Sequence, residues 1–125
     1  MFEYLAILDF EATCWENSNN HEIIEFPTVI VDIKTLTIID RIQIFVKPLN
    51  DPILSDFCTN LTGITQDQVN AGVSLHQAIK EHSKFMSKYS NSIFVTCGDW
   101  DLKTMLPMDC KINEIQVPGL YRKWR

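Results

Sequence analysis

Two acidic side chains follow the first apolar segment of the chain. Leu5 to Leu8 read LAIL, and Asp9 and Glu11 come next in the stretch LDFEAT. A carboxylate beside a buried strand costs free energy unless a hydrogen bond or a cation compensates its charge. Residues two apart on a strand point to the same face, about 7 Å apart along the chain. Two oxygen donors in this arrangement indicate a site for one or two Mg²⁺ or Mn²⁺ ions.

A third carboxylate is expected at the end of a neighbouring strand. Residues 91–98, NSIFVTCG, read as a short buried strand, and Asp99 and Asp101 follow it. Junctions between strand and helix are where α/β folds usually build their sites. Each acid also has a structural interpretation. Asp99 is well placed as a helix N-cap, Asp101 as a favourable acid in a first helical turn, and Glu11 as an exposed strand end.

The same stretch fits a second motif. An apolar strand followed by D-x-D-x-T is typical of phosphatases that use an aspartyl nucleophile, and residues 9–13 depart from it only by a glutamate at the second acid. This interpretation makes Asp9 a covalent nucleophile. It also requires a downstream lysine and a later acidic pair at a strand end, and neither is evident. The metal site is therefore the leading hypothesis, and the phosphatase is the alternative.

The elements that position these acids predict an α/β fold with a mixed sheet. The predicted strands, rich in apolar and β-branched residues, are residues 4–10, 25–34, 37–47 and 91–98. The short link between the second and third strands favours an antiparallel hairpin. The predicted helices are pieces within 54–72, a helix over 74–89, one from Asp99 that Pro107 limits, and a short one after Asn113. Thr65 and Gln68 form a possible capping box.

Length and composition restrict the possible functions. A chain of 125 residues predicts a single domain, residues 1–125, and its net charge of −5 disfavours broad, nonspecific binding to nucleic acid. No apolar run of about 18 residues predicts a membrane span. The first residues lack the basic start of a signal peptide. The four cysteines are widely spaced without a CxxC pair, which favours reduced thiols and a cytoplasmic or nuclear location.

Four separated segments match motifs of one enzyme group. They are LDFEATCW (8–15), HEIIEFP (21–27), LSDFCTNLTGITQDQV (54–69) and CGDWDLKTMLP (97–107). In this order they resemble the DEDDh 3′–5′ exonucleases, specifically the Eri and histone-mRNA exonuclease group. The last segment is most similar to the prion-protein-interacting member of that group.

This resemblance implies an RNase H-like exonuclease fold, in which three antiparallel strands are joined by a parallel strand. It also implies removal of nucleotides from RNA 3′ ends by two-metal phosphodiester hydrolysis, with two Mg²⁺ or Mn²⁺ ions. Asp9, Glu11 and Asp101 match the catalytic, metal-ligating acids of the group, which leaves Asp99 its capping role. The implied partner is a single-stranded RNA 3′ end or the overhang of a stem-loop.

The resemblance further implies a pocket for the terminal nucleotide. Its residues are Ala12, Thr13, Cys14, Leu61, Thr62, Gly63, Ile64 and Trp100. The first three would lie against the nucleotide, partly through backbone groups, and the Leu-Thr-Gly-Ile element would touch the sugar and the base. Trp100 would offer a stacking surface, which suits single-stranded RNA because every base has a π-face. The structural alternative for Trp100 is a core aromatic.

The sequence departs from the group after the second motif. The group has a third motif, a histidine followed by a last aspartate, whereas no histidine follows His82 and no aspartate follows Asp109. We therefore expect a C-terminally truncated domain without the last strand and helices, and an open sheet edge through which copies can associate. His82 falls at an apolar helix position and is expected in the core. The alternative function is a catalytically impaired fragment that binds RNA and metal.

Overall fold

A mixed five-stranded sheet forms the centre of the molecule. The computed structural model describes residues 1–15, 21–98 and 100–122. The strands are β1 (Tyr4–Leu8), β2 (Glu11–Ala12), β3 (Ile23–Asp32), β4 (Thr37–Phe45) and β5 (Ser92–Val95). β3 pairs antiparallel with β1, β2 and β4, and β5 pairs parallel with β1 at the edge of the sheet. The predicted mixed sheet is therefore confirmed.

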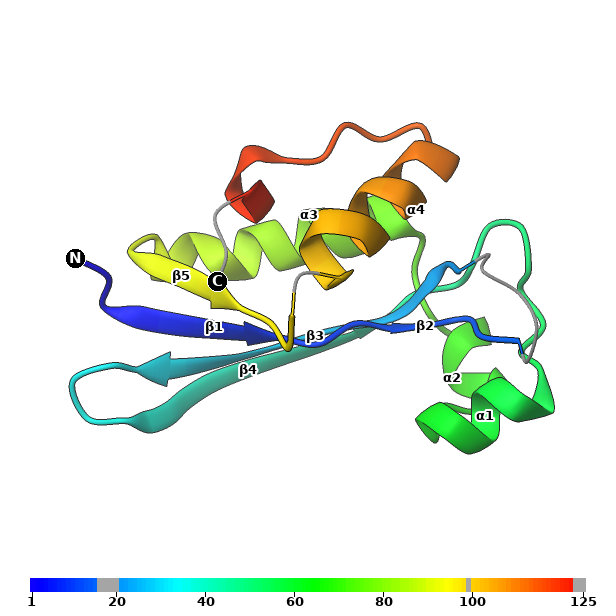
Figure 1. Cartoon of the computed structure of the whole chain (residues 1–125), viewed down its shortest axis with the longest axis horizontal. Coiled ribbons are helices and arrows are strands. Elements are labelled where there is room, and N and C mark those ends of the chain that lie inside the picture. The colour runs from blue at the N-terminus through cyan, green and yellow to red at the C-terminus, as the bar shows by residue number, and fades with distance from the viewer. Residues whose placement is uncertain (16–20, 99, 123–125) are drawn as a thin grey trace.

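Among the described residues, two helices cover one face of this sheet, and two others lie beside it. They are α1 (Asp56–Thr62), α2 (Gln66–Asn70), α3 (Leu75–Met86) and α4 (Leu106–Ile112). α3 and α4 lie over the sheet, whereas α1 and α2 lie beside the end of β2 (Figure 1). Alternate residues of β3, such as Phe26 and Ile30, are fully buried in the core beneath the helices. Within the described ranges, none of the helices is long and apolar enough to cross a membrane.

Hydroxyl side chains begin three of the helices. Ser55, Thr65 and Ser74 are the N-caps of α1, α2 and α3, and each side-chain oxygen accepts a backbone N–H of the first turn. At α2 the predicted capping box is confirmed, because the Gln68 side chain also accepts the Thr65 N–H. The helical pieces expected after the hairpin and the helix expected after Ser74 are confirmed as well.

β3 and β4 form the predicted antiparallel hairpin. Asp32 Oδ1 accepts the backbone N–H groups of Lys34 and Thr35, which closes the link between the strands. An aspartate that bonds the backbone two or three residues further on is typical of tight turns. Leu36 completes the turn with a φ of 56°.

The first predicted strand is interrupted before its expected end. β1 stops at Leu8, and β2 begins at Glu11. Pro27 of β3 lies at the level of this break, and a proline has no N–H to donate to a neighbouring strand. In the break, Phe10 is buried in the core and Asp9 is exposed. The interruption therefore keeps the alternation of a strand while freeing the backbone N–H of Phe10 for another partner.

The C-terminal part of the chain differs from the prediction. Trp100–Met105 form a π-helix that runs directly into α4, so Pro107 does not end the helix. Pro107 lies in the first turn of α4, where its missing N–H removes no α-helical hydrogen bond. The helix expected after Asn113 is wrong, because Glu114 adopts a φ of 57° and the chain forms only a 3₁₀ turn at Gly119–Arg122.

His82 is a core residue of α3, as its apolar position predicts. Its Nε2 lies 2.7 Å from Thr28 Oγ1, and its Nδ1 lies 2.8 Å from the hydroxyl oxygen of Tyr121. The ring also stacks with those of Phe94 and Tyr121. Burial lowers the pKa of His82 from 6.5 to about 3, so the ring is neutral. This histidine joins β3, α3 and the C-terminal turn.

Candidate active site

Asp101 connects the break between β1 and β2 to the first turn of the π-helix. Its Oδ2 accepts the backbone N–H of Phe10 at 2.7 Å. The two residues are 91 positions apart in the sequence, and Asp9 and Glu11 flank Phe10. Asp101 itself is only 5% exposed. The structure thus brings together the acids of the two strand ends, as the sequence predicts.

The three acids interact electrostatically. Burial raises the pKa of Glu11, and the negative charges of Asp9, Glu25 and Asp101 raise it further. Burial also raises the pKa of Asp101, and the negative charge of Asp9 raises it further. The hydrogen bond from the Phe10 N–H acts in the other direction and lowers this pKa. A carboxylate whose charge raises the pKa of another carboxyl group lies within electrostatic reach of that group. A cation among them would relieve this repulsion.

The donor set suits hard divalent cations. Asp9, Glu11 and Asp101 offer carboxylate oxygens, which Mg²⁺ and Mn²⁺ prefer. In the part of the chain that the structure describes, no group of three or more His, Cys, Asp or Glu side chains is arranged to hold a metal ion by itself. Mg²⁺ usually keeps several waters and takes one or two carboxylates together with substrate phosphates. The acids therefore fit a site that water and substrate complete, not a closed protein cage.

Next to the acids lies a strand-end segment that we call the pocket segment. It consists of Ala12, Thr13 and Cys14. The Thr13 N–H donates to the carbonyl of Glu22, and the Glu22 N–H donates to Thr13 Oγ1. His21 Nδ1 lies 2.7 Å from the Thr13 carbonyl oxygen, and Ser55 Oγ donates to the Cys14 carbonyl at 2.7 Å. The pocket segment is thus held by β3 on one side and by the N-terminus of α1 on the other.

The predicted substrate residues differ in what they can offer to RNA. Ala12, Thr13 and Ile64 are at most 8% exposed. Their side chains therefore shape the site from within and leave only backbone groups for contact with RNA. Leu61 and Trp100 are 68% and 40% exposed. These two apolar side chains are available to a nucleotide.

The Leu-Thr-Gly-Ile element ends α1. Gly63 is the C-cap, with a φ of 77° and its N–H bonded to the Thr59 carbonyl. This left-handed conformation favours glycine. Thr62 Oγ1 accepts the N–H of Ile64, and the Ile64 side chain packs into a small hydrophobic cluster with residues of α1 and α2. The turn therefore anchors Ile64 inward and leaves Leu61 exposed.

Trp100 is not a core aromatic, since it lies at the surface one residue before Asp101. Its ring meets that of His21 edge-on, with the ring centroids 5.9 Å apart. His21 also bonds the pocket segment at Thr13. Trp100 is thereby linked to both the acids and the pocket segment. Asp99, expected as an N-cap, lies outside the described residues.

Glu22 is a structural acid that the sequence analysis missed. It is 4% exposed, and its carboxylate accepts the backbone N–H groups of Leu49, Asn50 and Asp51 at 2.8–2.9 Å. Backbone donors compensate its charge in place of a metal ion. The local signal is an acid directly before the apolar residues Ile23 and Ile24, and this signal does not reveal donors that lie 27 to 29 positions away.

Asp109 is a second buried acid without a predicted role. Its Oδ2 accepts the Ile23 N–H at 2.9 Å, and its Oδ1 accepts from Asn113 Nδ2 at 3.0 Å. Burial raises its pKa to about 6, although these two hydrogen bonds act to lower it. Asp109 therefore fixes α4 to the start of β3, next to the residues that hold the pocket segment.

Comparison with known proteins identifies the family. The model of the family RNase_T, described as Exonuclease, matches residues 6–119. The chain belongs to this exonuclease family. Exonucleases of the family depend on a metal, in agreement with the oxygen donors of the acid cluster. The aspartyl phosphatase alternative is not supported, because the family match covers both strand ends that carry the acids.

Two human enzymes are similar to this chain over nearly its whole length. Human 3′-5′ exoribonuclease 1 is 40% identical over 132 residues, and human ERI1 exoribonuclease 3 is 40% identical over 130 residues. Each comparison covers 98% of this chain, but only 38% and 39% of the respective relative. The chain thus spans little more than a third of the length of these curated relatives.

A solved structure gives the same fold. The nuclease domain of 3′hExo, a DEDDh family member bound to rAMP, matches with a TM-score of 0.93 and 38% identity. The match covers 98% of this chain and 66% of that one. The mixed sheet and its helices are therefore the RNase H-like fold of DEDDh exonucleases, and the predicted resemblance is confirmed.

Proposed function

We propose that this chain removes nucleotides from RNA 3′ ends by metal-dependent hydrolysis of phosphodiester bonds. The observation that carries the proposal is the hydrogen bond from the Phe10 N–H to Asp101, because it unites the acids of two strand ends. The names of the similar human enzymes, 3′-5′ exoribonucleases, support the polarity and the RNA substrate.

In this proposal, Asp9, Glu11 and Asp101 hold two divalent ions, Mg²⁺ or Mn²⁺. Such ions supply an activated water and stabilise the leaving 3′ oxygen. The fold of the chain orients the carboxylates that would bind these ions. The Phe10 N–H fixes one oxygen of Asp101, and the partial burial of Glu11 makes an unpaired negative charge unfavourable there.

The proposed substrate is a single-stranded RNA 3′ end, free or as the overhang of a stem-loop. The terminal nucleotide would lie between the pocket segment and the end of α1. The exposed Trp100 ring and the exposed Leu61 side chain would make apolar contacts with it. Stacking on an aromatic side chain suits unpaired bases. The net charge of −5 is consistent with recognition of an end and not of a long phosphate backbone.

A labelled RNA digest tests this function. With Mg²⁺, a single-stranded RNA labelled at its 5′ end is expected to give a ladder that shortens with time, because nucleotides leave from the 3′ end. The same RNA labelled at its 3′ end releases its label in the first step. EDTA stops both reactions, since the carboxylates alone cannot activate water. Large internal fragments, or digestion that persists in EDTA, would contradict the proposal.

The alternative function, a chain that binds RNA and metal without hydrolysis, gives a different result. It predicts intact RNA with and without Mg²⁺, together with a gel shift that needs Mg²⁺. That pair of results would assign the chain a binding role.

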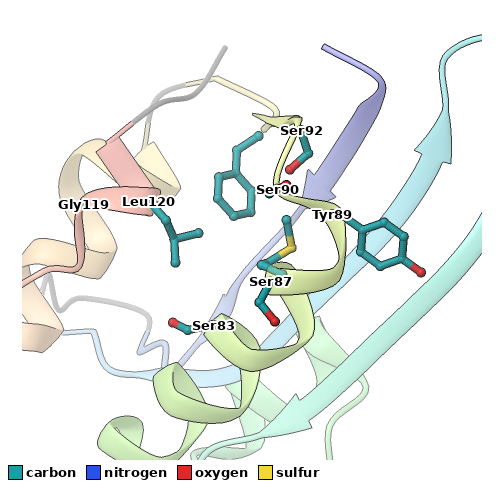
Figure 2. A pocket seen from close by; sticks show the side chains of 9 residues that line it. Ser83, Ser87, Tyr89, Ser90, Ser92, Gly119 and Leu120 are labelled. Carbon is teal, nitrogen blue, oxygen red and sulfur yellow. The ribbon is translucent and has the colours of Figure 1, made fainter.

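We also propose that two copies of the chain associate along β5. β5 is the edge strand beside β1, and a cavity of about 610 Å³ lies between it, α3 and the C-terminal turn (Figure 2). Met86, Phe94 and Leu120 give this cavity an apolar lining. None of the predicted active-site residues is among the described residues that line it. An open edge beside an apolar groove favours pairing with another strand.

Substitution at the edge tests this association. Ser92→Lys places a charge on β5 in the lining of the cavity, whereas His76→Lys places the same charge on an exposed position of α3. In sedimentation equilibrium, the wild type and His76→Lys are expected to approach twice 14.5 kDa as concentration rises, and Ser92→Lys to remain at 14.5 kDa. A wild type that stays monomeric at every concentration would refute the association.

We further propose a cytoplasmic or nuclear location and a single exonuclease domain over residues 1–125. All four cysteines are free thiols, which suits a reducing compartment. The continuous family match supports a single domain.

A further inference from the structure

Ser55 forms the link between the two walls of the nucleotide pocket. Its hydroxyl donates to the Cys14 carbonyl at 2.7 Å and accepts the Cys58 N–H at 3.0 Å. The first bond reaches the pocket segment, and the second caps α1. A hydroxyl has one proton and two lone pairs, so a single side chain can make both bonds at once.

The helix that Ser55 begins carries the other wall of the pocket at its far end. α1 has seven residues, about 10 Å of helix, and ends in the turn that exposes Leu61. A short helix moves as a rigid rod, so a shift at its N-terminus is passed on to Leu61. The distance between the pocket segment and Leu61 therefore depends on how the N-terminus of α1 is held.

Other contacts between α1 and the pocket segment are weaker. Cys58 Sγ lies 3.6 Å from the Ala12 carbonyl, and a thiol is a weak donor. Cys14 packs against the small hydrophobic cluster that contains Cys58 and Ile64, and apolar packing is not directional. The thiols of Cys14 and Cys58 also form a hydrogen bond, which is weak because a thiol is a poor donor and a poor acceptor. Ser55 thus makes the strongest hydrogen bond that the described residues show from the start of α1 to this segment.

We propose that Ser55 is a positioning residue that sets the spacing of the RNA 3′-end pocket. This inference rests on the proposed function, since it assigns Ser55 to the same pocket. Loss of its bond to Cys14 lets α1 and the pocket segment separate. The pocket then binds the terminal ribose with less selectivity for its 3′-hydroxyl. The measurable consequence is a weaker preference for a free 3′-hydroxyl, with little change for the rest of the RNA.

A set of matched variants separates this role from simple helix capping. Ser55→Ala removes both bonds, whereas Ser55→Thr keeps the hydroxyl. Ser55→Gly removes the donor but costs the helix cap only a few tenths of a kcal/mol. Ser74→Ala is the control, because Ser74 caps α3 in the same way by accepting the Gln77 N–H at 3.1 Å.

The readout is the ratio of affinities for one RNA with a 3′-hydroxyl and the same RNA with a 3′-phosphate, measured with Ca²⁺ as the divalent ion. We expect Ser55→Ala and Ser55→Gly to lower this ratio by roughly 2- to 10-fold, as for the loss of one hydrogen bond. Ser55→Thr and Ser74→Ala are expected to keep the wild-type ratio. Melting temperatures identify any variant that does not fold. If Ser55→Ala does not fold, Ser55→Gly still tests the proposal.

The outcomes distinguish this inference from the function on which it rests. A wild type that does not discriminate between the two RNAs overturns the proposed 3′-end pocket and the role of Ser55 together. A wild type that discriminates, with an unchanged ratio in Ser55→Ala and Ser55→Gly, overturns the role of Ser55 alone. An equal loss in Ser74→Ala would assign the effect to helix capping and would also overturn it.

Discussion

Asp101→Asn is expected to lower the rate of RNA 3′-end hydrolysis roughly 10²-fold or more, and Asp9→Asn to do the same. Removal of one charged group that stabilises a transition state costs about 3 kcal/mol or more, and each 1.4 kcal/mol is a factor of ten in rate. Asparagine keeps the size of the side chain and an oxygen that can accept the Phe10 N–H. The loss therefore reports on charge and metal binding and not on the fold.

Initial rates with 5′-labelled RNA at saturating Mg²⁺ measure this effect. Asp67→Asn is the matched control, because Asp67 is an exposed acid in the first turn of α2. It should retain the wild-type rate. Variants of Asp9 and Asp101 that digest RNA as fast as Asp67→Asn would show that the acid cluster is not the catalytic centre.

The second large effect concerns stability and centres on His82. His82→Ala removes a fully buried ring, leaves the Thr28 hydroxyl without this partner, and leaves the Tyr121 hydroxyl with only the long contact of 3.4 Å to Ser83 Oγ. A cavity of this kind together with unsatisfied polar groups is expected to cost about 3 kcal/mol or more. This is a large part of the 5–15 kcal/mol typical of a domain. Urea unfolding of the wild type and the variant measures the difference.

His82 also makes stability depend on pH in a defined direction. Its pKa is lowered from 6.5 to about 3 by burial, so the unfolded chain binds a proton between these values that the folded chain does not. This contribution to stability is therefore complete above pH 6.5 and is lost as the pH falls toward 3, by at most about 1.4 kcal/mol per pH unit. The raised pKa of Asp109, about 6, acts in the opposite direction.

Comparison with His82→Gln isolates the histidine, because Asp109 is present in both proteins. The stability advantage of the wild type over His82→Gln is expected to shrink as the pH falls below 6.5. Free energies of unfolding in urea at several pH values between 4 and 8 give this difference. A difference that stays constant over the range would mean that His82 does not titrate as its burial predicts.

The parts of the site that the sequence predicts are those with a local signal. Asp9, Glu11 and Asp101 follow apolar runs, and acids in such places need a partner whatever the rest of the fold. The capping box of Thr65 and Gln68 is likewise a pattern within four residues. The stacking role of Trp100, by contrast, is implied by the family resemblance and not by a local pattern, and its side chain is exposed.

The parts that the sequence does not reveal depend on distant backbone groups. Glu22 is satisfied by N–H groups of residues 49–51, and Asp109 by that of Ile23, and neither pairing leaves a local trace. Ser55 caps α1, and its second bond, to the Cys14 carbonyl, spans 41 positions and leaves no local trace either. The sequence does not reveal that a π-helix precedes Pro107, so that Pro107 falls in the first turn of α4, where its missing N–H removes no α-helical hydrogen bond.

The central claim is that Asp9, Glu11 and Asp101 together bind divalent ions at the RNA 3′ end. Calorimetric titration of Mn²⁺ into the chain, with excess adenosine 5′-monophosphate to complete the site, tests this claim without requiring activity. The account predicts binding by the wild type and by Asp67→Asn, and loss of at least one bound ion in Asp101→Asn. Identical titration curves for the wild type and Asp101→Asn would contradict it.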